Sequence, residues 1–143
     1  MGRLQMWGNT RKKKSTKIDT LVGENTELTG DVNFVGGLHV DGIVKGNISA
    51  DTDTNSLFSL SEQGTIEGEI NVPYNVIDGT VIGNIYGSKH VELEAKSRIT
   101  GDVYYNLLEI ASGAQISGRL VHTPDAGEAE PKLIDDITSD DYN

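Results

Sequence analysis

Apolar and polar residues alternate with a period of two along the middle of the chain, but only over three to five residues at a time. Leu38-His39-Val40 and Val91-Glu92-Leu93 are two such segments. They are separated by Gly, Asn and Asp, residues that favour bends. Between residues 18 and 122 no segment combines a helical period with capping residues. The pattern therefore predicts many very short strands joined by tight bends.

A five-residue unit, aliphatic-x-Gly-x-aliphatic, recurs in this region. Its glycines are separated by 16, 22, 15, 18 and 17 positions, at Gly30, Gly46, Gly68, Gly83, Gly101 and Gly118. A repeat of about 18 residues is too short for helix pairs or propeller blades, and it accommodates three short strands. It predicts an all-β fold, a three-sided β-helix (solenoid) of about six coils, with the aliphatic residues inward and glycine at a bend or facing outward. The general hand of strand crossovers favours a right-handed β-helix, and the uneven spacing disfavours a left-handed hexapeptide helix.

Three interruptions define the expected boundaries. Residues 51–56 are polar and fill the longest interval between glycines, so they are expected to form a loop. Pro73 cannot donate a hydrogen bond to a strand neighbour and predicts a second irregularity. Pro124 ends the pattern. The chain thus divides into an arm at residues 1–17, a β-helix at 18–122 and a tail at 123–143, with the arm and the tail expected to be disordered.

Charge separates the same three parts. The whole chain carries a net charge of -10, made up of +6 in residues 1–17, -10 in residues 18–122 and -6 in residues 123–143. A folded body of this sign is unlike that of a nucleic-acid-binding protein, whose surface is usually positive, so no nucleic-acid partner is expected.

The arm joins apolar side chains to a basic cluster. Trp favours the membrane interface, and Lys clusters favour anionic headgroups at ~1 kcal/mol per residue, so the arm predicts membrane binding. A single arm would bind weakly, whereas many arms on one polymer would bind well by avidity. A solvated leader without a target is the alternative. The residues expected to contact the membrane are Met1, Arg3, Leu4, Met6, Trp7, Arg11, Lys12, Lys13, Lys14 and Lys17.

Candidate chemistry is sparse. The chain has no cysteine and three histidines, His39, His90 and His122, which are expected to lie on the surface without converging on a metal. The run Asp51 to Asn55, with Glu62 at the twelfth position, resembles a calcium loop. It has Ser56 where the turn requires Gly, and it lacks helical flanks. No catalytic residue, cofactor or metal site is therefore predicted.

The ends of a β-helix expose backbone hydrogen-bonding groups and a section of the core, which must be capped or covered by another molecule. The arm is a poor cap because it is basic and aperiodic. The short apolar cluster Leu133, Ile134 and Ile137 in the tail is the alternative cap for the last coil. Covering by a second copy of the chain would produce an open-ended polymer, since neither kind of joint closes on itself. The residues expected at the joints are Leu21, Val22, Leu28 and Val32 in the first coil, and Ile116, Leu120 and Val121 in the last.

The repeated units in register, together with the segments 37–48, 99–103 and 108–118, resemble the bactofilins. The resemblance covers residues 18–122. It implies a bacterial cytoskeletal scaffold with a right-handed three-sided β-helix that polymerises end to end without nucleotide. It also implies a cytoplasmic location, peripheral at the inner face of the cytoplasmic membrane. The implied partners are other copies of the chain, an anionic membrane surface and client proteins such as cell-envelope enzymes.

The function expected from the sequence is thus assembly rather than catalysis. The alternative is a discrete, non-polymerising β-helical binding module or a metal-dependent β-helix enzyme.

Overall fold

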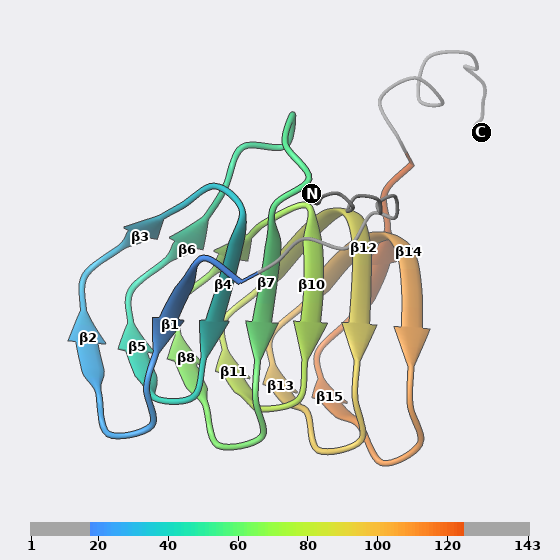
Figure 1. The fold of residues 1–143 in the computed structure, drawn as a ribbon. Coiled ribbons are helices and arrows are strands. Elements are labelled where there is room, and N and C mark those ends of the chain that lie inside the picture. The colour runs from blue at the N-terminus through green and yellow to red at the C-terminus, as the bar shows by residue number, and fades with distance from the viewer. Residues whose placement is uncertain (1–17, 125–143) are drawn as a thin grey trace, which may run out of the picture.

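The computed structural model describes residues 18–124, which form sixteen strands and no helix. This part of the chain accordingly has no helix that could cross a membrane. The strands wind into a right-handed solenoid of six coils with three flat sides, which we call faces 1, 2 and 3 (Figure 1). The fold class predicted from the repeat is confirmed.

Neighbouring coils pair through parallel strands on every face. Face 1 consists of β1 (Thr20–Val22), β4 (Gly37–Val40), β7 (Leu57–Leu60), β10 (Tyr74–Ile77) and the second halves of β12 (Ile85–Leu93) and β14 (Val103–Ile110). Face 2 consists of β2 (Glu27–Thr29), β5 (Ile43–Lys45), β8 (Thr65–Glu67), β11 (Thr80–Ile82), β13 (Arg98–Thr100) and β15 (Gln115–Ser117). Face 3 consists of β3 (Val32–Asn33), β6 (Ile48–Ser49), β9 (Ile70–Asn71), the first halves of β12 and β14, and β16 (Leu120–His122).

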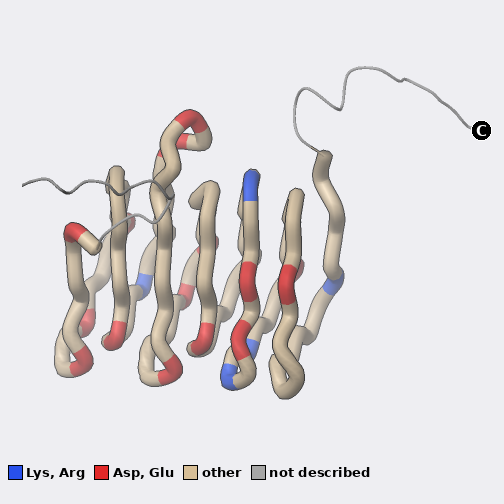
Figure 2. The backbone as a smooth tube through the Cα atoms, turned by 45° about the vertical axis from the view of Figure 1, so that its right-hand side comes forward, with Lys and Arg blue, Asp and Glu red and all other residues tan. Residues whose placement is uncertain are grey.

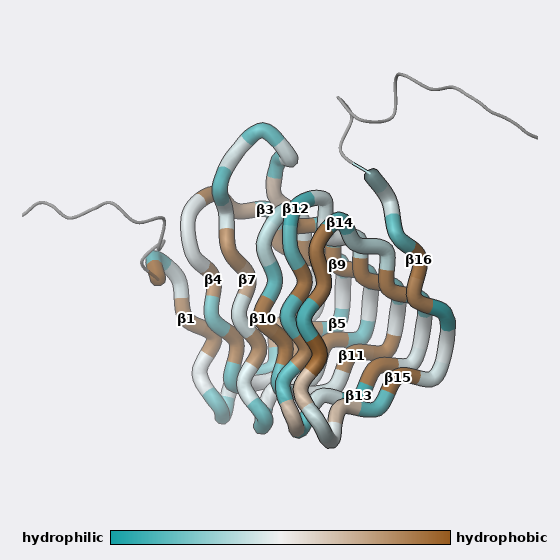
Figure 3. The backbone as a smooth tube through the Cα atoms, turned by 90° about the vertical axis from the view of Figure 1, so that its right-hand side faces the viewer, coloured by the Kyte–Doolittle hydropathy of each residue, from teal (hydrophilic) through white to brown (hydrophobic). Residues whose placement is uncertain are grey.

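The core is a set of aliphatic columns that run parallel to the solenoid axis. Within face 2, Val44, Ile66 and Val81 occupy equivalent positions in successive coils, and each is fully buried. Outward residues alternate with these inward ones, so the alternation along each short strand separates core from surface. Figure 3 looks along the solenoid onto its last coil and shows the three sides around this core.

The repeated glycines form their own column at the corner between faces 2 and 3. A Cβ at Gly46 would collide with the carbonyl oxygen of Gly30, and one at Gly68 with that of Gly46. The same contact recurs at Gly83, Gly101 and Gly118, each with the preceding glycine of the column. Glycine is required here because the backbones of successive coils approach too closely for any side chain.

Polar side chains next to the glycine column hold successive coils in register. The side-chain Oδ1 of Asp31 accepts a hydrogen bond from the backbone N–H of Asn47, and Asn47 Oδ1 accepts one from Glu69 N, both at 2.9 Å. Asn84 Oδ1 accepts a hydrogen bond from Asp102 N, and Asp102 Oδ1 accepts one from Arg119 N, again at 2.9 Å. We call these residues the Asx ladder. Each of these side chains accepts a hydrogen bond from the backbone of the following coil.

Both internal irregularities predicted from the sequence are present. Residues 51–56 form a loop that projects from the solenoid between β6 and β7 (Figure 1). The carbonyl of Pro73 accepts hydrogen bonds from the backbone N–H groups of Lys89 and His90, at 3.0 and 2.9 Å. The pairing of β12 with β14 shifts by one residue at this point, between Gly87 and His90.

Candidate functional site

The core is closed along the length of the solenoid but open at both ends. In the inward column of face 2, the middle residues are fully buried, whereas Leu28 in the first coil and Ile116 in the last remain only partly covered. The column of face 3 behaves alike: Ile48, Ile70, Ile85 and Val103 are fully buried, and Leu120 is 43% exposed. Each end therefore presents a section through the core.

The end at the last coil is the more open of the two. Ile110 pairs in register with the buried Leu93 and is 45% exposed, similar to Leu120. At the other end Val22, which pairs with the buried Val40, is only 8% exposed. The last coil thus offers an apolar surface whose members are Leu108, Ile110, Ile116 and Leu120, which we call the C-terminal end surface.

Most of the residues predicted at the joints lie at these ends. Val22, Leu28 and Val32 point inward in the first coil, and Ile116 and Leu120 point inward in the last. The remaining two occupy different positions. Leu21 pairs with the outward His39 and is 61% exposed on face 1, and Val121 pairs with the outward Tyr104 on face 3. These two side chains belong to the sides of the solenoid rather than to its core section.

Sequence reasoning did not assign Leu108 and Ile110 to an end. Both residues lie in the last coil, which begins at Leu107 on face 1. The signal was present, because Leu108-Glu109-Ile110 repeats the apolar alternation of Val91-Glu92-Leu93 one coil earlier.

Each end also presents unpaired strand edges. Strands β1, β2 and β3 have a partner on one side only, as do β15, β16 and the face 1 half of β14. Backbone N–H and C=O groups on such edges are able to pair with another strand. Apolar side chains and open edges therefore coincide at each end.

The two ends differ in charge. Residues 18–36 contain four acidic residues, Asp19, Glu24, Glu27 and Asp31, and no basic residue. Figure 2 shows acidic positions alone on the first coil. The last coil carries Glu109 and Arg119, and Arg119 pairs with Asp102 at 3.0 Å. The hydrogen bonds from Arg119 lower the pKa of the Asp102 carboxyl.

The three histidines lie apart, on β4, β12 and β16, so they do not converge on one site. Both ring nitrogens of His39 are hydrogen-bonded to neighbouring side chains: Nδ1 lies 3.0 Å from Ser59 Oγ, and Nε2 lies 3.0 Å from Asp41 Oδ1. Among the described residues, no group of three possible metal ligands includes Asp51, Asp53 or Glu62 of the suspected calcium loop.

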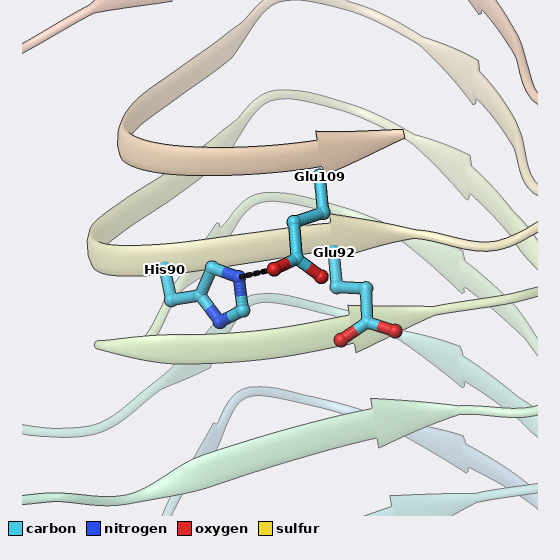
Figure 4. A group of neighbouring side chains, drawn as sticks. All are labelled: His90, Glu92 and Glu109. Carbon is cyan, nitrogen blue, oxygen red and sulfur yellow. Dashed lines mark ion pairs between the residues drawn. The ribbon is translucent and has the colours of Figure 1, made fainter. Parts of the chain in front are cut away.

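One group of possible metal ligands does occur within residues 18–124, and sequence reasoning missed it. It comprises His90 and Glu92 on β12 and Glu109 on β14, with ligand atoms that all lie within 4.8 Å of one another (Figure 4). Sequence reasoning assigned no residue to a metal. The signal was the spacing His90-x-Glu92, which places both side chains on one side of a strand, with Glu109 one coil later.

The membrane-binding residues predicted in the arm, from Met1 to Lys17, lie outside the described residues, as does the tail from residue 125. Their placement stays a prediction.

Comparison with known proteins agrees with the architecture. The family model for bactofilins, described as polymer-forming cytoskeletal, matches residues 20–121. Bactofilin BacO of Myxococcus xanthus (strain DK1622) is 30% identical over 109 residues, which cover 76% of this chain and 83% of that protein. Bactofilin BacP of the same organism is 28% identical over 122 residues, which cover 82% of this chain and 46% of that protein. No solved structure matches the chain significantly. With a six-coil solenoid and a family match spanning nearly all of it, the chain belongs to the bactofilin family of polymer-forming cytoskeletal proteins.

Proposed function

We propose that this protein assembles end to end into filaments, without nucleotide, by burying the open ends of its solenoid against other copies. The observation that carries this proposal is the exposed core at the last coil, where Ile110 and Leu120 are almost half exposed at positions that are buried in the preceding coil. Joining the ends would give these side chains the neighbours that their equivalents already have.

The expected energies are compatible with a reversible polymer. In a joint between two C-terminal end surfaces, covering the almost half-exposed Ile110 and Leu120 contributes about 1 kcal/mol each. The partly covered Leu108 and Ile116 contribute about 0.5 kcal/mol each, so the two surfaces together contribute roughly 6 kcal/mol. Association costs about 4–15 kcal/mol in lost freedom, so the apolar surface alone is close to the break-even point. Edge pairing adds ~0.5–1.5 kcal/mol for each hydrogen bond formed. Because burial and pairing are both spontaneous, no nucleotide hydrolysis is required.

We further propose that the arm holds the polymer at the inner face of the cytoplasmic membrane, where it positions client proteins. Support comes from the apolar and basic composition of residues 1–17, which contrasts with the acidic solenoid. Repetition of the arm along a filament would multiply a weak attraction.

The decisive experiment is electron microscopy and sedimentation of the purified full chain without ATP or GTP. Filaments that pellet above a critical concentration are expected. A monodisperse monomer at high protein concentration would rule out the proposal.

A further inference from the structure

The outward side of face 1 carries an unusual concentration of carboxylates at the boundary between the last two coils. Glu92 and Glu109 are direct partners in the pairing of β12 with β14, and Glu94 lies two residues beyond Glu92. Like charges directly opposite each other in a sheet are destabilising unless something neutralises them. A bound proton or a bound cation would relieve this repulsion by supplying positive charge.

The protein supplies little of that charge. Among the described residues, His90 is the basic side chain within ion-pair distance of Glu109, with Nε2 3.7 Å from Oε2. None lies within that distance of Glu92 or Glu94. Lys89 is adjacent in sequence, but its Nζ lies 3.5 Å from the Thr54 carbonyl in the projecting loop. Lys96 pairs with Glu62, at 3.6 Å.

The possible ligand atoms of His90, Glu92 and Glu109 lie near one another, although the Glu92 carboxylate points away from the other two in Figure 4. They lie within 4.8 Å of one another, and Figure 4 shows the imidazole and the Glu109 carboxylate side by side with Glu92 adjacent. Ligands of a tetrahedral Zn²⁺ at ~2.0–2.2 Å from the ion are about 3.4 Å apart. Two flexible glutamate side chains can close the difference by small rotations.

The backbone holds this group in place. His90 and Glu92 protrude from the same side of one strand, and β14 fixes Glu109 one coil away in exact register with Glu92. The backbone N–H of His90 is anchored by the Pro73 carbonyl at 2.9 Å. A shallow concavity of about 180 Å³, lined by Glu92, Glu94, Glu109 and three apolar neighbours, opens beside the carboxylates.

We propose that His90, Glu92 and Glu109 form a binding site for a borderline divalent transition-metal ion such as Zn²⁺. One imidazole and two carboxylates suit such an ion, because softer ions prefer thiolates and Ca²⁺ or Mg²⁺ prefer oxygen ligands alone. Three protein ligands leave a coordination position for water or for a group from another molecule.

The ion would join coil 5 to coil 6, since two of its ligands come from β12 and the third from β14. It would thereby fasten the coil that carries the C-terminal end surface. A bound ion stabilises the folded state in proportion to its occupancy.

The test uses the untagged, metal-stripped full chain titrated with Co²⁺, whose visible absorption reports coordination, followed by displacement with Zn²⁺. One saturable equivalent is expected, and H90A and E109Q should each weaken binding about tenfold or more. H39A is the matched control, because His39 lies on the same face with both ring nitrogens already occupied, and H122A controls for the remaining imidazole. Both controls should bind as the unaltered chain does.

A second readout is thermal unfolding with and without Zn²⁺. The midpoint should rise in the unaltered chain and in H39A, and it should stay unchanged in H90A. Absence of saturable binding, or binding that H90A and E109Q leave intact, would overturn the assignment. Circular dichroism of each variant verifies that loss of binding is not loss of fold.

Discussion

Gly46 lies directly over Gly30, so closely that a Cβ on Gly46 would collide with the Gly30 carbonyl oxygen. Such contacts continue along the corner between faces 2 and 3 and set the spacing of the coils there. The first prediction follows from this contact.

Gly46→Ala is expected to destabilise the solenoid by about 2–3 kcal/mol, because the clashing atoms are backbone and neither coil can yield easily. Gly46 has no positive φ, so the effect would be steric rather than conformational. The matched control is Gly23→Ala, where the nearest atom to a new Cβ is Thr26 Oγ1 at 3.9 Å. Urea unfolding followed by circular dichroism measures both. Equal stability of the two variants would contradict the steric role of the column.

The second prediction concerns the C-terminal end surface. Leu120→Arg and Ile110→Arg are each expected to abolish filaments, since the joint would then bury an unpaired charge at a cost of several kcal/mol. Sedimentation and electron microscopy are the measurements.

Ile82→Arg is the control for this pair. Ile82 is 49% exposed, comparable with Ile110 and Leu120, but it faces outward in the middle of the solenoid. Filaments should persist in Ile82→Arg. If all three variants still polymerise, the joint does not use this surface.

The third prediction concerns the arm. Deletion of residues 1–7 is expected to abolish co-sedimentation with anionic vesicles while leaving filaments intact, because the apolar anchor is removed and the solenoid is untouched. Replacement of Trp7 by Ala should weaken the binding in the same assay. Unchanged pelleting of the deletion variant would argue against membrane attachment through this segment.

The fourth prediction concerns pH. The hydrogen bond with Glu94, partial burial, and repulsion from Glu94 and Glu109 raise the pKa of Glu92 to about 7. An unfolded glutamate ionises near its ordinary value of 4.5, so the folded state holds the proton more tightly between these values. Stability of the metal-free chain should therefore fall as pH rises from about 4.5 to 7.

Glu92→Gln cannot ionise, so relative to the unaltered chain it should gain stability as the pH is raised from 5 to 8. His90 also borders the site and lies within ion-pair distance of Glu109, so its own variant should be compared. Glu24→Gln removes one exposed charge in the first coil and serves as control. Thermal unfolding in the presence of a chelator is the measurement. Parallel pH profiles for Glu92→Gln and the unaltered chain would refute the prediction.

The sequence predicted the solenoid well because one local rule recurs in every coil. The unit Val44-x-Gly46-x-Ile48 places two aliphatic residues inward on either side of a glycine corner, and its copies stack in register. Pro73 and the polar run before Ser56 marked the irregular places for equally local reasons.

What the sequence could not readily show depends on contacts between coils. Glu92 and Glu109 are 17 positions apart, and only the register of β12 with β14 makes them neighbours. The outward direction of Leu21 likewise depends on its pairing with His39 rather than on its own apolar character. The Asx ladder was hidden in the same way, since Asp31 and Asn47 are ordinary bend residues until they are stacked.

The Asx ladder gives the solenoid a polarity along its axis. The four acceptor side chains, Asp31, Asn47, Asn84 and Asp102, each face the following coil, and Glu69 interrupts the series in the third coil. The series ends at Arg119, whose side chain has only hydrogen-bond donors. A further coil added after Arg119 would find no acceptor, whereas one placed before Asp31 would meet a free backbone donor. A joint between like ends is therefore chemically different from a joint between unlike ends. A label on one terminus of each subunit would show which of the two joints a filament contains.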